Sequence, residues 1–325
     1  MKACIYGAGA IGSWLGMALA QEGCTVSMVA RGAALQALQT EGLRMHRADG
    51  TRAQAPVTAS KDPGTLGVQD LVVVAVKAPA LPDVAQALSP LLGPDTMVLI
   101  AMNGVPWWFL DGVSGAARGH ALQAVDAGGT IARAIAAHHV VGSVAHTSCS
   151  LEAPGVVRQH FGNRLIVGEP DGHRSARVTA LAEVLQRGGI DAEVSTNIQK
   201  DIWYKLWGNM TVNPISAITG ATTDLILGDE LVRDFVSRIM REAKEIGARM
   251  GIPIDQQPED RHAVTLKLGA FKTSMLQDVE AGKTIELDGL VTVVKELGTL
   301  TGVDTPFTDA LLGLARLHAR IRGLY

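Results

Sequence analysis

The chain opens with an apolar, strand-like run that leads directly into a glycine-rich turn and then a helical pattern. Gly7, Gly9 and Gly12 have the G-x-G-x-x-G spacing that is typical of turns cradling a dinucleotide pyrophosphate. A helix over residues 11–22 would aim its N-terminal amides and partial positive charge at that anion. We therefore predict a cofactor-binding turn that consists of Gly7, Ala8, Gly9, Ala10, Ile11 and Gly12.

The same segment has one competing interpretation, a secretory signal, because Lys2 precedes an apolar run that reaches Ala20. Signal sequences do not need glycines at this spacing, and the exit at residues 21–23 is typical of a helix end. We therefore interpret the segment as the start of a folded domain.

Length and composition limit the class of protein. A chain of 325 residues exceeds the ~250–300 residues at which one hydrophobic core stops growing, so two domains are expected. Its net charge of −3 gives no electrostatic case for nucleic acid or an anionic membrane as partner. The longest apolar stretch, residues 97–110, is interrupted by Asn103, Gly104 and Pro106, which argues against a membrane span.

The three cysteines, Cys4, Cys24 and Cys149, have no metal-ligand spacing and form no even disulfide set. We therefore expect no metal site and a reducing, cytoplasmic location.

Strand-like and helical patterns alternate in the first part of the chain. Continuous apolar runs rich in β-formers, as expected for parallel strands buried on both faces, are residues 1–7, 25–30, 71–76 and 97–101. A helical pattern over residues 80–92 would connect the last two of these. This alternation predicts an α/β fold, a Rossmann-type doubly wound sheet.

Other segments add strands and then helices. Residues 42–60 predict an antiparallel hairpin around residues 48–50, and residues 128–167 predict strands with a turn at 153–155. A helix over 175–188 and a strand at 192–194 complete the predicted N-terminal domain, 1–196. Residues 197–325 predict a mostly α-helical C-terminal domain, with helices over 198–210, 229–250, 258–268, 288–301 and 305–322.

The end of the second strand indicates which dinucleotide binds. An NAD site normally has an acidic residue there, whereas this chain has Arg31, whose charge would attract the 2′-phosphate of NADP. Lys77 follows another strand at the same edge of the sheet and is a second candidate for cofactor contact. A solvated surface role for either cation remains the alternative.

Lys205, Asn209 and Asn213 are spaced by four, so they share one stripe of a helix whose neighbouring residues are apolar. An ammonium and two amides on an otherwise buried face are costly without partners, which favours a ligand-facing site over a salt-bridged helix edge. Pro214 is expected to bend the helix beside Asn213. Hydride transfer to a ketone needs a proton donor, and partial burial would lower the pKa of a lysine from ~10.4 toward the working pH.

With the glycine turn, Arg31, Asn103-Gly104 and Lys205…Asn209…Asn213-Pro214, the chain resembles the ketopantoate reductase family. A second signature is Ser274-Met-Leu-Gln-Asp278 followed by Lys283-Thr-Ile-Glu286. The resemblance runs from residue 1 to about residue 310. It implies NADPH-dependent reduction of 2-dehydropantoate to pantoate, in a cleft between a Rossmann-type domain and a helical domain.

The resemblance also implies the role of each site residue. Lys205 would be the proton donor, Glu286 would orient substrate or the cofactor ribose, and Asn103 would contact both nicotinamide ribose and substrate. Asn209, Asn213 and Ser274 would bind the hydroxyl and carboxylate of the substrate.

Two departures from the family pattern leave the substrate open. Trp107 and Trp108 follow Asn103-Gly104 and either line a different pocket or pack inside the protein, and Thr223 stands where the family has an asparagine. The alternatives are a reductase of another 2-oxo acid, a β-hydroxyacid dehydrogenase, which the Ser274–Glu286 pair argues against, and a non-catalytic NADP-binding sensor. The apolar C-terminal helices are compatible with a homodimer, but the sequence does not distinguish this from internal packing.

Overall fold

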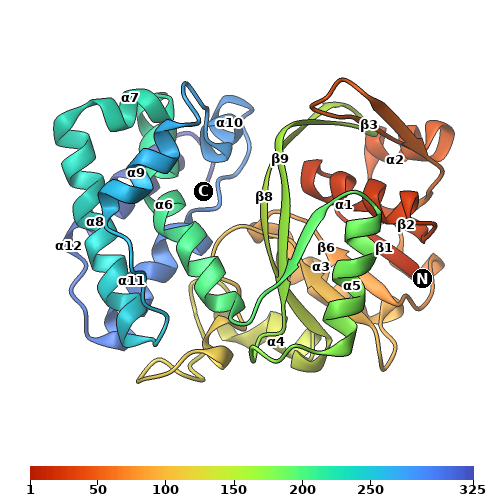
Figure 1. Ribbon diagram of the computed structural model, residues 1–325, viewed down its shortest axis with the longest axis horizontal. Coiled ribbons are helices and arrows are strands. Elements are labelled where there is room, and N and C mark those ends of the chain that lie inside the picture. The colour runs from red at the N-terminus through yellow and green to blue at the C-terminus, as the bar shows by residue number, and fades with distance from the viewer. The chain divides into compact units, whose positions relative to one another are not determined.

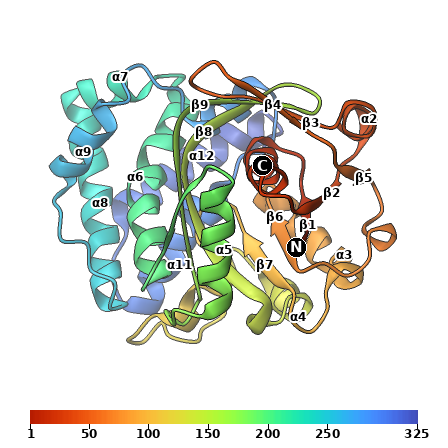
Figure 2. The ribbon, with the colours of Figure 1, turned by 45° about the vertical axis from the view of Figure 1, so that its right-hand side comes forward.

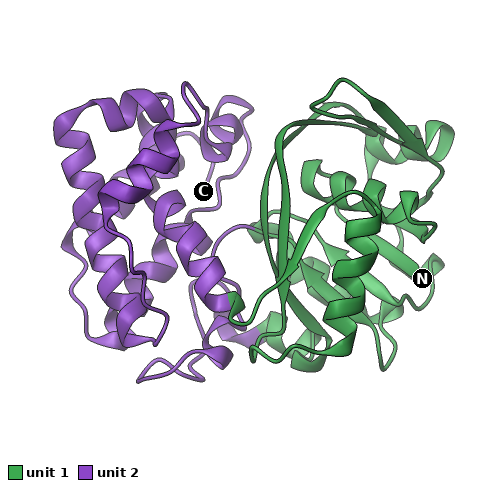
Figure 3. Cartoon of the chain, in the orientation of Figure 1, with its two compact units in different colours: residues 1–102, 130–198 green, residues 103–129, 199–325 purple.

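The computed structural model describes residues 1–325, and the chain divides into two compact units (Figure 3). Unit 1 comprises residues 1–102 and 130–198, and unit 2 comprises residues 103–129 and 199–325. None of the helices combines the length and apolarity that a membrane crossing requires. All three cysteines are free thiols.

Unit 1 is an α/β sheet structure (Figure 1), in which β5, β2, β1, β6, β7 and β8 are parallel neighbours in that order. Its elements are β1 (Lys2–Tyr6), α1 (Ala10–Gln21), β2 (Thr25–Val29), α2 (Gly32–Glu41), β3 (Leu43–His46), β4 (Arg52–Ala55), β5 (Thr58–Ser60), β6 (Leu71–Val74), α3 (Leu81–Ala87), β7 (Met97–Ile100), α4 (Thr130–Ala134), β8 (Val140–Ala153), β9 (Val156–Gly168), α5 (Ala176–Arg187) and β10 (Asp191–Val194). The predicted Rossmann-type fold is confirmed.

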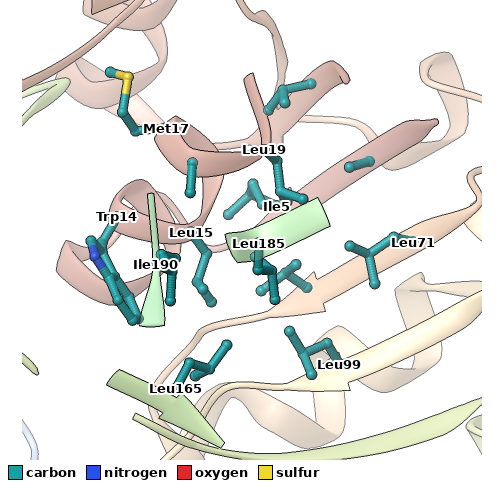
Figure 4. Close-up of a cluster of buried hydrophobic side chains, with 14 of the residues drawn as sticks. Ile5, Trp14, Leu15, Met17, Leu19, Leu71, Leu99, Leu165, Leu185 and Ile190 are labelled. Atoms are coloured by element: carbon teal, nitrogen blue, oxygen red, sulfur yellow. The ribbon is translucent and has the colours of Figure 1, made fainter. Parts of the chain in front are cut away.

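The central strands have no polar face because the sheet is covered on both sides. In β1 both Ile5, on one face, and Cys4, on the other, are fully buried. Leu15 and Leu19 of α1 pack in one cluster with Ile5 and with Leu185 of α5 (Figure 4). Continuous apolar runs are therefore what the parallel strands require.

The long strands β8 and β9 form an antiparallel hairpin whose turn lies at residues 154–155, within the predicted 153–155 (Figure 2). The first part of β9 pairs in parallel with β3, and its last part pairs in parallel with β10. The hairpin predicted over residues 42–60 is confirmed for β3 and β4, whereas β5 instead pairs in parallel with β2.

Two predicted elements, the strands from residue 128 and the helix that ends at residue 210, have wrong boundaries. The predicted strands begin at residue 128, but residues 127–139 form helical turns that include α4, because Gly128 and Gly129 adopt positive φ and start a turn. The helix predicted to end at Met210 continues past Pro214 to Thr219. Buried side chains on both sides of the proline, such as Met210 and Ile215, provide packing that offsets the lost hydrogen bond.

Unit 2 is mostly helical, and α6 and α8 lie close together in it. Trp207 on α6 donates from Nε1 to the carbonyl of Met240 on α8 at 2.7 Å, and Gly247 leaves room for Trp203. The elements are α6 (Ile198–Thr219), α7 (Thr223–Gly228), α8 (Glu230–Arg249), α9 (Pro258–Leu266), α10 (Ser274–Glu280), a π-helical turn (Asp288–Thr292), α11 (Val293–Thr301) and α12 (Pro306–Ile321).

Residues 103–129 group with unit 2, although the N-terminal domain predicted from the sequence, 1–196, includes them. Ser114 donates its amide to the carbonyl of Met250 at 2.9 Å. The carboxylate of Glu296 accepts from the amides of Gln123 and Ala124. These contacts join residues far apart in the chain, so no local pattern marks them.

We expect Gly12→Ala to destabilise unit 1 by about 1–3 kcal/mol, because an added Cβ would lie 2.2 Å from the carbonyl oxygen of Gly7. Gly9→Ala is the matched control, since the nearest atom to its Cβ, the oxygen of Ala75, lies 3.9 Å away. Urea denaturation of both variants measures the difference. Equal denaturation midpoints would contradict the close approach of strand and helix.

Candidate functional site

The glycine-rich turn of unit 1 has the geometry of an anion cradle. Gly7 has φ +111°, and a Cβ there would lie 2.6 Å from the oxygen of Ala75. Gly9 is the N-cap of α1, and no side chain accepts hydrogen bonds from the first amides of the helix. Those amides and the open space above Gly9 fit a pyrophosphate, which would need both.

Arg31 and Lys77 lie just beyond the ends of two strands that flank β1. Arg31 is the exposed N-cap residue of α2 and has no ion-pair partner in the structure. Burial raises the pKa of Tyr6, at the end of β1, and the charge of Arg31 opposes that shift, so the guanidinium lies near the glycine turn. Lys77 is exposed and precedes a short 3₁₀ turn after β6.

In unit 2 the ammonium of Lys205 donates to Oδ1 of Asn103 at 2.9 Å. Asn103 is held in place by its neighbours in the loop. Val105 donates its amide to the carbonyl of Gly289 at 2.9 Å, and Gly104, with φ +86°, passes so close to Gly289 that a Cβ would lie 2.4 Å from its oxygen. The structure therefore joins two of the predicted residues that are 102 positions apart.

Burial lowers the pKa of Lys205 to about 8. The carboxylate of Glu286 opposes this shift, and the guanidinium of Arg261 adds to it. Glu286 is itself only 7% exposed. Around neutral pH Lys205 is mostly an ammonium that can give up its proton readily, which is the condition for efficient acid catalysis.

Asn209 and Asn213 lie on the same stripe of α6 as Lys205, as predicted. Asn209 is partly exposed and Asn213 is 5% exposed, and neither side-chain amide makes a hydrogen bond within the protein. A buried amide without a partner is costly, so Asn213 in particular is suited to a polar ligand, and the partly exposed amide of Asn209 is open to the same ligand.

Ser274 is the exposed first residue of α10. The helix cap is Thr273, whose hydroxyl accepts from the amide of Leu276, so Ser274 does not serve as the cap. No contact joins Ser274 to Lys205, and its role stays a prediction.

Hydrogen bonds to the C-terminal residues hold the segment that carries Glu286, on both sides of that residue. Ile285 donates its amide to the carbonyl of Leu324 at 3.0 Å, and Tyr325 donates its hydroxyl to Asp288 at 2.7 Å. A π-helical turn follows at residues 288–292 and presents the carbonyl of Gly289 to the Asn103 loop. Such turns occur often at functional sites.

The residues that depart from the family pattern are buried in unit 2. Trp107 and Trp108 are both buried, and the next residue, Phe109, packs against Trp203 with ring centroids 6.1 Å apart. Thr223 is 1% exposed and donates its hydroxyl to the carbonyl of Gly269. The aromatic pair thus belongs to the packing of the unit.

Arg261 is not among the site residues that the sequence predicts. It lies on α9, an amphipathic helix in which an arginine is unremarkable, and only its fold-dependent proximity to Lys205 distinguishes it. The one local signal is Gly208, a glycine inside a helix between Trp207 and Asn209, which indicates a close approach by another group.

Comparisons with known proteins agree on one family. A family model described as "Ketopantoate reductase PanE/ApbA" matches residues 3–172, and "Ketopantoate reductase PanE/ApbA C terminal" matches residues 197–319. A 2-dehydropantoate 2-reductase from Mesorhizobium japonicum is 45% identical over the full length of both chains.

Solved structures show the same likeness. A candidate ketopantoate reductase from Ralstonia solanacearum MolK2 is 54% identical, with a TM-score of 0.95 over 100% of this chain and 99% of that one. A 2-dehydropantoate 2-reductase from Methylococcus capsulatus is 27% identical, with a TM-score of 0.85 over 99% of this chain and 98% of that one.

We expect Glu286→Gln to lower the pKa of Lys205 below about 8, because the variant loses the carboxylate that stabilises the ammonium. NMR titration of ¹³C-methylated lysines, with Lys205→Arg to assign the signal, measures this pKa. Glu280→Gln is the control, since Glu280 is exposed and pairs with Lys272 instead. A pKa unchanged by Glu286→Gln would exclude the coupling.

Proposed function

The chain belongs to the ketopantoate reductase family, a family of NAD(P)-dependent oxidoreductases, and from that premise we propose that it reduces 2-dehydropantoate to pantoate with NADPH. The observation that carries this proposal is Lys205, a partly desolvated ammonium bonded to Asn103 and coupled to Glu286. Two 2-dehydropantoate 2-reductases among the relatives support the substrate.

We assign the proton transfer to Lys205. When bound, the nicotinamide supplies the hydride that adds to the carbonyl carbon of the substrate. Lys205 Nζ gives its proton to the carbonyl oxygen, which becomes the hydroxyl of the product, and bulk water then restores the ammonium. Its lowered pKa makes this donation easier, and a positioned acid of this kind typically contributes ~10²–10⁴-fold.

The polar side chains around Lys205 hold the substrate in this proposal. Asn209, Asn213 and Ser274 bind its hydroxyl and carboxylate, while Asn103 keeps Lys205 oriented and contacts the substrate and the nicotinamide ribose. Glu286 orients the substrate or the ribose and keeps Lys205 protonated. Unpartnered amides on Asn209 and Asn213 support this assignment.

The cofactor is assigned to unit 1. The glycine turn and the amides of α1 hold the pyrophosphate, and Arg31, which has no carboxylate partner, pairs with the 2′-phosphate of NADPH. Lys77 adds a second cation. A homodimer stays a prediction from the sequence.

We expect Lys205→Met to reduce turnover of 2-dehydropantoate by about 10²–10⁴-fold with little change in NADPH affinity, because unit 1 holds the phosphates. In the wild type, the rate of reduction should fall above about pH 8, as the donor loses its proton, and the rate of pantoate oxidation should rise. NADPH absorbance measures both directions.

Lys200→Met is the control for this assay, since Lys200 is exposed on the same helix and pairs with Asp255. A near-normal rate in Lys205→Met would remove Lys205 from the chemistry. NADPH binding without consumption of any 2-oxo acid would identify a sensor, and a preference for aromatic 2-oxo acids would identify a different reductase.

We expect Arg31→Asp to shift cofactor preference from NADPH to NADH, since a carboxylate repels the 2′-phosphate and accepts from the ribose hydroxyls. The ratio of kcat/KM for the two cofactors measures this. Arg52→Asp, an exposed change on β4, is the control for added negative charge. An unchanged ratio in Arg31→Asp would mean that another residue holds the phosphate.

A further inference from the structure

Arg261 on α9 is a cation that has no carboxylate partner. No acidic side chain lies within ion-pair distance, and its Nε is fully buried without a hydrogen-bond partner. Two arginines of the facing helix α8 differ, since Arg238 pairs with Asp234 and Arg241 pairs with Glu259. A buried charge is costly unless it is paired, so this guanidinium is suited to an anion from outside the chain.

The guanidinium is seated against α6, next to the Lys205 stripe. Its carbon lies 5.3 Å from the centre of the Tyr204 ring. A Cβ at Gly208 would lie 2.8 Å from its Nε and 3.1 Å from its Nη2, so the glycine makes room for it. Glycine inside a helix costs ~1 kcal/mol relative to alanine, which indicates that this space serves a purpose.

Tyr204 and Gly208 immediately precede Lys205 and Asn209 in α6, so the two pairs occupy neighbouring stripes of the helix. A contact that does not involve Arg261 also holds α9 in place, since His262 Nε2 lies 2.8 Å from the hydroxyl of Ser237 on α8. The charge of Arg261 also acts on Lys205. The guanidinium is therefore held near the proton donor by the helix packing.

Arg261 brings a second positive charge close to Lys205, whose pKa also responds to the carboxylate of Glu286. Arg261 itself has no carboxylate within ion-pair distance. A 2-oxo acid carries one negative charge. Its carboxylate would supply the missing counter-charge while its carbonyl oxygen faces Lys205, and a guanidinium binds a carboxylate with two parallel hydrogen bonds.

We propose that Arg261, whose guanidinium occupies the space opened by Gly208, is a substrate-binding residue that anchors the carboxylate of the 2-oxo acid. This rests on the proposed function. Arg261 thereby distinguishes acids from neutral ketones, a selectivity that Lys205 and the amides of Asn209 and Asn213 do not provide alone.

The test compares wild type with Arg261→Met, using 2-dehydropantoate and its primary amide as substrates. We expect KM for the acid to rise about 10–100-fold, as loss of a charged hydrogen bond implies, with little change for the amide. Arg241→Met, which removes an exposed arginine of α8 that pairs with Glu259 of α9, should change neither. Equal losses for acid and amide, or none, would overturn the proposal.

Two further measurements separate binding from folding. Gly208→Ala keeps the charge but displaces the guanidinium, so it should raise KM for the acid in the same direction. Arg261→Met also removes a positive charge that lowers the pKa of Lys205, so this pKa should rise. The pH above which the rate of reduction falls should therefore be higher in the variant. An unchanged pH would contradict the proximity of the two cations.

If the wild type reduces no 2-oxo acid, the proposed function fails, and oxamate binding measured by calorimetry tests the anion site separately. Weaker oxamate binding in Arg261→Met than in wild type would support the site. Equal binding, or none in either protein, would overturn it.

Discussion

The hydrogen bond between Lys205 and Asn103 is the interaction on which the geometry of the candidate site depends. It holds an ammonium in surroundings dry enough to bring its pKa down to about 8. The ammonium is stabilised in such surroundings by the hydrogen bond that Asn103 accepts and by the negative charge of Glu286. The same arrangement that lowers the cost of burying Lys205 also orients its proton.

The fold supplies the rigidity that this arrangement needs. Lys205 lies in the middle of α6, a helix of 22 residues whose tryptophans are locked against α8. Asn103 lies in a loop that is pinned to the π-helical turn after Glu286 by the amide of Val105. Asn103 and Glu286 are therefore positioned by elements other than α6, so the site forms only when unit 2 is folded.

The two units differ in the chemistry of their polar groups. Unit 1 presents backbone amides and the cations Arg31 and Lys77 at the ends of parallel strands, where an anionic cofactor is bound in such folds. Unit 2 contains the ionisable and amide side chains that suit a small polar substrate. The assignment of Arg261 adds a specificity element to unit 2, because a charge without a partner favours ligands that bring one.

Local pattern in the sequence determined the Rossmann-type sheet, the glycine turn and the stripe of Lys205, Asn209 and Asn213, because strand, turn and helix periodicity depend on neighbouring residues. The predicted helices of the second unit follow for the same reason. Tertiary structure alone decided that residues 103–129 join unit 2, that Trp107 and Trp108 pack inside it, and that Arg261 lies beside Lys205. Those features depend on contacts between residues far apart in the chain, and no short-range spacing encodes them.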